Sequence, residues 1–124
     1  RLWRNMERGA EYFLTQPVYS REKVDQILAA TRDVAAPIFL GIMPLASHRN
    51  AEYLHNEFPG ISIPDDVRER MRLAGESGAY EGVEIAWELM EYALPRFAGV
   101  YVMPPFNRHA AALALLARAR AAGL

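Results

Sequence analysis

Apolar residues along this chain gather in three short runs, separated by longer stretches in which they recur at helical spacing. The runs lie at 12–15, 38–43 and 100–103, and proline follows each of them closely. Runs of four to six residues that are apolar with little alternation are typical of strands covered on both faces in a parallel sheet. The pattern therefore predicts three buried strands.

Helical spacing and capping residues predict the elements between these strands. Ser20 begins a helix that ends before Pro37, since a residue preceding proline avoids the helical region. Ser47 caps a second helix that reaches about Glu57, and its inward residues are Ala51 and Leu54, with Tyr53 as a third candidate. Further helices are predicted over 2–8, 64–73, 80–93 and 108–121.

Strands that alternate with helices indicate right-handed βαβ crossovers and a parallel sheet. Three strands are fewer than a doubly wound sheet usually has, and a (β/α)₈ barrel needs about 250 residues. Such a sheet leaves two unpaired edges and one uncovered face. We therefore expect a native unit larger than this chain, completed by a missing part or by a second copy in a homo-oligomer.

Composition narrows the class of protein. The chain has 124 residues, 52% of them apolar and 23% charged, which fits one packed core. Its net charge of -1 argues against nucleic acid or an anionic membrane as a partner. The absence of cysteine excludes a thiolate zinc site and a thiol nucleophile, and it favours a cytoplasmic location. Without an initiator Met or a signal peptide at its start, the chain is expected to be a fragment, a processed product or a trimmed form.

Two amide side chains follow the first two predicted strands, where ligands bind in parallel α/β folds. Gln16 offers a donor and an acceptor side by side, which suits a pyrimidine-like or pterin edge; a solvated loop amide is an equal alternative. Asn50 lies one turn into the helix after the second strand and adds an amide near the same edge, unless it is a solvated helix residue.

A cation follows the third predicted strand. Arg108 stands at the start of a helix, where a cation gains nothing from the helix dipole. Its guanidinium is suited to a carboxylate or phosphate tail, although an ordinary surface arginine is the common case. The histidines, by contrast, show no metal-ligand spacing and are expected at the surface or in loops; they are His48, His55 and His109.

Other conspicuous side chains are expected to be structural. Trp87 sits at an apolar helical position and is predicted to lie in the core. The acidic stretch from Glu81 to Glu91 is predicted to be the solvated face of an amphipathic helix. No phosphate-binding glycine loop, nucleophile elbow or zinc-binding helix motif is present.

Three separated segments carry a resemblance to a known family. The string Gly-Ala-Glu-Tyr-Phe-Leu-Thr-Gln-Pro-Val-Tyr at 9–19 resembles the sixth strand region of the methylenetetrahydrofolate reductase barrel. Residues 41–51 resemble its seventh strand and loop, and Asn107-Arg108 its closing Asn-Arg pair. The resemblance covers essentially the whole chain. The motifs look most like those of the family branch in which the reductase is fused behind a homocysteine S-methyltransferase domain.

The resemblance implies an α/β fold that is a partial (β/α)₈ barrel, made of about the last three βα units, with 1–124 as the C-terminal portion and no second domain. The parent would be a flavin-dependent oxidoreductase of one-carbon metabolism and methionine biosynthesis. It would reduce 5,10-methylenetetrahydrofolate to 5-methyltetrahydrofolate with NAD(P)H. The family's catalytic acid lies in the first five strands, so this fragment is expected to be inactive alone.

The resemblance also implies roles for individual residues. Gln16 would hydrogen-bond the pterin, Asn50 would make a polar contact to the substrate, and Arg108 would bind the p-aminobenzoyl-glutamate side. Arg4 and Asn5 lie where the family contacts FAD, and Asn5 replaces a frequent lysine. No residue is implied to be catalytic or to bind a metal.

Two substitutions depart from the family pattern. Leu54 occupies a position where some members stack an aromatic ring on the substrate, and Pro104 replaces an aromatic residue near the last loop. These departures concern the residue that stacks on the substrate. Separately, the missing catalytic half and the unpaired sheet edges leave two alternatives open. One is a non-catalytic βα module that self-associates or completes another chain's barrel, and the other is a different barrel enzyme in which Arg108 binds a phosphate or carboxylate.

Overall fold

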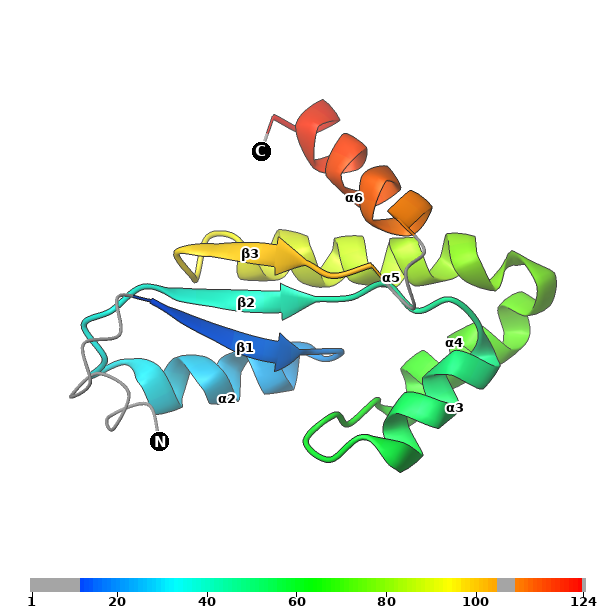
Figure 1. The fold of residues 1–124 in the computed structure, drawn as a ribbon, viewed down its shortest axis with the longest axis horizontal. Helices are drawn as coiled ribbons and strands as arrows, with labels where there is room; N and C mark the ends of the chain where they lie inside the picture. Colours follow the sequence, from blue (N-terminus) through cyan, green and yellow to red (C-terminus); the bar gives the residue numbers. More distant parts are fainter. Residues whose placement is uncertain (1–11, 105–108, 124) are drawn as a thin grey trace.

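The computed structural model describes residues 12–104 and 109–123 (Figure 1). Its elements are, in chain order, β1 (Phe13–Pro17), α2 (Arg21–Thr31), β2 (Ile38–Ile42), α3 (His48–Glu57), α4 (Asp65–Ala74), the 3₁₀ turn η1 (Gly75–Ser77), α5 (Gly78–Ala93), β3 (Gly99–Val102) and α6 (His109–Ala121). The strands form one parallel sheet in the order β1-β2-β3. The predicted α/β alternation is confirmed, and the predicted helix over 2–8 lies outside the described residues.

Two predicted boundaries are wrong, and one is confirmed. β1 continues through Pro17, so Gln16 belongs to the strand and not to the loop after it. α2 ends before Pro37 as predicted; its last residue is Thr31, whose hydroxyl donates to the carbonyl of Ile27. α5 begins at Gly78, because η1 carries the chain directly from α4 into it.

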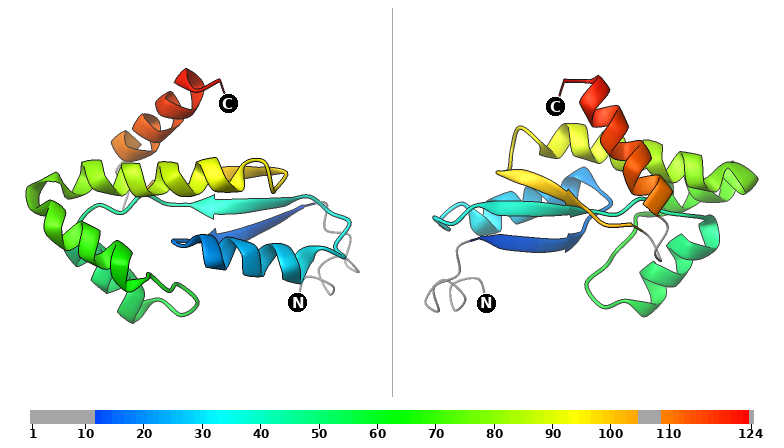
Figure 2. Two further views of the ribbon diagram at one scale, coloured as in Figure 1. Left: turned by 180° about the vertical axis from the view of Figure 1, so that it is seen from behind. Right: turned by 45° about the horizontal axis from the view of Figure 1, so that its top comes forward.

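Helices cover only one face of the sheet within the described ranges. Leu40 and Ile42 of β2 point to the face on which α2 and α5 pack, and they share one core with Val24 and Trp87. Figure 2 shows α2 and α5 on this side and no described element on the other. We call the uncovered side the open face; its residues include Tyr12, Leu14, Phe39 and Tyr101.

A second core lies beyond the carboxyl ends of the strands. Buried Tyr19 and Leu45 come from the segments after β1 and β2, and they pack with Leu54 of α3, Met71 of α4 and Ile85 of α5. This core therefore fixes the segments that leave β1 and β2. Among the described helices, none is long and apolar enough to cross a membrane.

Candidate functional site

The end of β1 carries a bulge that presents Gln16. Leu14 pairs with Phe39 and Pro17 pairs with Gly41, so β1 has one residue more than β2 over this stretch. The Thr15 hydroxyl accepts the Gly41 N–H at 2.9 Å and donates to the Gln16 carbonyl at 2.9 Å. A side chain thus takes a place in the ladder, which is how bulges commonly redirect a neighbouring residue beside functional sites.

The Gln16 side chain is exposed and lies against the turn between α3 and α4. A Cβ built on Gly60 would be 2.5 Å from Oε1 of Gln16, and Gly60 has φ +86°, a conformation that favours glycine. The positive φ restricts this turn position to glycine, and the short distance shows that the turn lies beside the Gln16 carboxamide. The sequence pattern marks a turn here, but it does not show that the turn contacts Gln16.

Tyr19 fixes the loop after β2 from the side of β1. It is 4% exposed, and its hydroxyl donates to the Met43 carbonyl at 3.0 Å. Burial raises the pKa of the Tyr19 hydroxyl, so the hydroxyl stays protonated at neutral pH and can donate this hydrogen bond.

Helix α5 supports the same loop from the other side. A Cβ at Gly82 would collide with the backbone of Leu45, and a Cβ at Gly78 would be 3.2 Å from Cα of Ser47. The absence of side chains at these two positions lets α5 lie directly on the loop. Its first turns therefore pack on the segment that leads into α3.

Asn50 lies in the first turn of α3 and is buried. It is 7% exposed, its Oδ1 accepts the Ala46 N–H at 2.9 Å, and its own N–H donates to the Ser47 hydroxyl at 3.0 Å. The alternative of a solvated helix residue is therefore wrong: the Ala46 bond holds the amide inside. Its Nδ2 is buried and has no hydrogen-bond partner in the part of the chain that the structure describes. Such a donor costs about 1–3 kcal/mol, so it calls for an explanation.

The structure brings these two amides to neighbouring strand ends. Gln16 is the next-to-last residue of β1, Asn50 follows β2, and β1 and β2 are paired in parallel. Together they provide neutral donors and acceptors and no formal charge. Such a set can recognise the polar edge of an uncharged heterocycle by hydrogen bonding.

Other residues with expected roles fall elsewhere. Arg108, Arg4 and Asn5 lie outside the described residues. Leu54 is 3% exposed and packs in the second core, so its side chain supplies core volume. Tyr53, an inward candidate, is instead 49% exposed and forms an edge-to-face pair with Phe58.

The histidines for which the structure gives contacts serve the fold. His55 Nδ1 accepts the Ile63 N–H at 3.0 Å, which ties α3 to the segment before α4, and His48 pairs with Glu52 along α3. The described ranges hold no group of three or more His, Asp or Glu residues that could bind a metal ion.

The acidic stretch of α5 does more than contact solvent. Arg70 of α4 bonds Glu88 through two N–H groups, at 2.8 and 2.9 Å, and it bonds Glu81 at 2.8 Å. The Arg70 guanidinium lowers the pKa of the Glu88 carboxyl. These acids therefore join α4 to α5, while Trp87 is buried as predicted.

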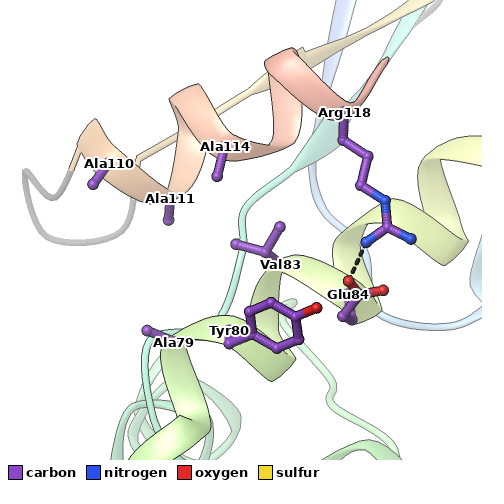
Figure 3. Close-up of a pocket in the computed structure, with 8 residues that line it drawn as sticks. All are labelled: Ala79, Tyr80, Val83, Glu84, Ala110, Ala111, Ala114 and Arg118. Atoms are coloured by element: carbon purple, nitrogen blue, oxygen red, sulfur yellow. Dashed lines mark hydrogen bonds and ion pairs between the residues drawn. The ribbon is translucent and has the colours of Figure 1, made fainter. Parts of the chain in front are cut away.

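A groove of about 610 Å³ lies between α5 and α6 (Figure 3). Small side chains such as Ala110 and Ala114 line it, and the Arg118–Glu84 ion pair spans it. Every lining residue comes from these two helices and none from a strand or from the loops after β1 and β2. The groove is therefore separate from the amide site.

Comparison with known proteins identifies the family. The family model of methylenetetrahydrofolate reductase matches residues 1–116, while no curated protein matches the chain. Among solved structures, the chain is similar to an uncharacterised protein from Clostridium thermocellum that binds two copies of 5-methyl-5,6,7,8-tetrahydrofolic acid. The TM-score is 0.59 at 22% identity, over 94% of this chain and 44% of that one. The chain thus has the fold of the part of that protein that it matches. It covers less than half of that protein's length. Because the family model covers nearly all of it, the chain belongs to the methylenetetrahydrofolate reductase family.

Proposed function

We propose that this chain is the C-terminal portion, residues 1–124, of a (β/α)₈ reductase that converts 5,10-methylenetetrahydrofolate to 5-methyltetrahydrofolate with NAD(P)H. Its part is to bind the folate. The observation that carries this proposal is the buried Nδ2 of Asn50 after β2, which has no hydrogen-bond partner among residues 12–104 and 109–123, next to the strand end that presents Gln16. A pterin edge offers the acceptor that this donor lacks.

Each amide has a separate part in this binding. The Gln16 carboxamide bonds the polar edge of the pterin and so sets the orientation of its ring. Asn50 donates from Nδ2 while its Oδ1 stays bonded to Ala46, so its donor is held in position before the ligand arrives. Arg108 pairs with the carboxylate tail. The hydride donor and the catalytic acid belong to other parts of the parent enzyme.

The family implies FAD as cofactor. Arg4 and Asn5, which the resemblance implies as FAD contacts, lie outside the described residues. The two amides are suited to a neutral edge rather than a diphosphate. We place most of the flavin contacts in the remainder of the protein, along with the binding of NAD(P)H.

The open face supports the proposed place of the chain in a larger barrel. Leu14 is 54% and Tyr12 56% exposed on it, which is apolar surface that a barrel would enclose. The missing N-terminal half is the proposed occupant. The same face is the observation in favour of the alternative, a non-catalytic module completed by another chain. The proposal includes an upstream methyltransferase domain only because the motifs most resemble the family branch that carries one.

The test is a reductase assay on the full-length protein, with oxidation of NAD(P)H followed under anaerobic conditions in the presence of methylenetetrahydrofolate. We expect folate-dependent oxidation, and a Gln16→Ala variant whose kcat/KM for folate is roughly 10-fold to 100-fold lower, the loss of one or two hydrogen bonds. Gln26→Ala, at an exposed position of α2, is the matched control and should behave as wild type. Folate binding without oxidation would favour the module. The absence of both folate binding and oxidation would refute the proposal.

A further inference from the structure

Tyr101 of β3 reaches β1 across the intervening strand. Its hydroxyl donates to the Thr15 carbonyl, although β1 and β3 are not neighbours in the sheet. Tyr101 pairs in register with Gly41 of β2. A Cβ at Gly41 would lie 2.7 Å from that same Thr15 carbonyl oxygen. The missing side chain of Gly41 thus leaves a gap that the Thr15 carbonyl oxygen enters, and the Tyr101 hydroxyl bonds this oxygen.

The residues on either side of this contact form the bulge. Thr15 accepts the Gly41 N–H with its hydroxyl and the Tyr101 hydroxyl with its carbonyl, so β2 and β3 both hold it. Its hydroxyl also donates to the carbonyl of Gln16. Burial raises the pKa of Tyr101, so its hydroxyl stays a donor at neutral pH.

We propose that Tyr101 is a positioning residue for Gln16: by bonding Thr15 through the gap at Gly41, it holds the bulge that points the Gln16 amide at the folate. The far end of the same side chain lies beside Gly60, in the turn between α3 and α4. The Gln16 backbone is thus held by Thr15, to which β2 and β3 both bond. This inference rests on the proposed function for its ligand, but its structural part concerns the free protein.

The binding test is a double-mutant cycle on the full-length protein, titrated with 5-methyltetrahydrofolate. Tyr101→Phe removes one hydroxyl, and we expect it to weaken binding about fivefold, the worth of one hydrogen bond. In the Gln16→Ala background the same change should alter the dissociation constant by less than about twofold, because Tyr101 acts through Gln16. An equal loss in both backgrounds would mean direct contact or a general structural role and would overturn the proposal. Tyr80→Phe, which removes a hydroxyl from an exposed position of α5, is the control.

Amide hydrogen exchange tests, without ligand, whether Tyr101 holds the bulge. The Gly41 N–H bonds the Thr15 hydroxyl, so its exchange reports on the bulge. We expect Tyr101→Phe to speed this exchange at least about tenfold and to leave the amide of Leu40 in the middle of β2 within about twofold. Unchanged exchange at Gly41 would overturn the proposal. If the wild type binds no folate, the proposed function fails, and this measurement still decides the positioning role.

A second pair of variants guards against a Tyr101 variant that does not fold. Thr15→Val removes the hydroxyl from the ladder, whereas Thr15→Ser keeps it. We expect the valine variant to exchange Gly41 faster and to bind folate more weakly, and the serine variant to stay within about twofold of wild type in both. Equal Gly41 exchange and equal folate binding in the two variants would contradict the proposal that the bulge positions Gln16.

Discussion

Gly82 makes the closest approach between a helix and a loop beside the site. A methyl group there would overlap the Leu45 carbonyl, which is backbone and cannot rotate away. In an exposed helix interior, glycine to alanine would gain about 1 kcal/mol. Here the gain is opposed by overpacking, so packing and helix propensity point in opposite directions.

We expect Gly82→Ala to lower the free energy of unfolding of the full-length protein by about 1–3 kcal/mol. Urea denaturation measures it. Gly78→Ala is the matched control on the same helix, since its Cβ would meet Ser47 at 3.2 Å and require a shift of only a few tenths of an ångström. Its effect should be clearly smaller. A Gly82→Ala protein as stable as wild type would show that α5 does not rest on the loop as described.

At the residue scale, the sequence predicts which amides to examine but not their surroundings. Gln16 and Asn50 stand out because they follow apolar runs. Burial of Asn50 depends on the Ala46 bond and on α5 across the loop, which are contacts between distant segments. The Thr15–Tyr101 bond is likewise invisible in a sequence, because the two residues are 86 positions apart and meet only through the gap at Gly41.

Helices α4 and α5 are joined by charge as well as by apolar packing. Arg70 is partly buried and bonds two acids of α5, Glu81 and Glu88. The sequence predicts both helices from their apolar spacing. It cannot assign ion pairs between them, since which charges face each other depends on how the helices cross; the expected solvated face is therefore an interhelical contact.

The lowered pKa of Glu88 gives this contact a pH dependence. Because the folded carboxyl has a lower pKa than the unfolded one, its contribution is complete above the ordinary Glu range and is lost as the pH falls through the folded pKa. We expect Arg70→Gln to be less stable than wild type at pH 7, with the difference shrinking as the pH falls below about 4.

Urea denaturation from pH 7 to pH 3 measures that difference. Arg120→Gln removes the same charge from an exposed position on α6 and is the control, with little loss at any pH. A deficit for Arg70→Gln that stays constant across this range would contradict the assignment of the Glu88 pKa to Arg70.

On the scale of the whole molecule, the open face sets the behaviour of the isolated chain. Three strands covered on one side leave Tyr12 and Leu14 exposed among the described residues. The incomplete sheet follows from the sequence, because three apolar runs cannot close a barrel. What covers the open face does not follow from it, since the covering surface contributes no residue to this stretch.

We expect residues 1–124 produced alone to self-associate in light scattering, because the open face is apolar. Leu14→Lys on that face should shift the mass toward the monomer at 14.0 kDa. Leu73→Lys, which changes a leucine that is 71% exposed on α4, is the control and should leave the association unchanged. A monomeric wild-type fragment would mean that the open face needs no partner.

Folate recognition by the two strand-end amides is tested most directly by titrating the full-length protein with 5-methyltetrahydrofolate. Asn50→Asp keeps an oxygen for the Ala46 N–H but removes the buried donor, whereas Asn56→Asp makes the same change at an exposed position of the same helix. A thermal melt of each variant checks that it is folded. We expect wild type and Asn56→Asp to bind alike and Asn50→Asp to bind at least about tenfold more weakly. Undiminished binding by folded Asn50→Asp, or no binding by wild type, would contradict this site.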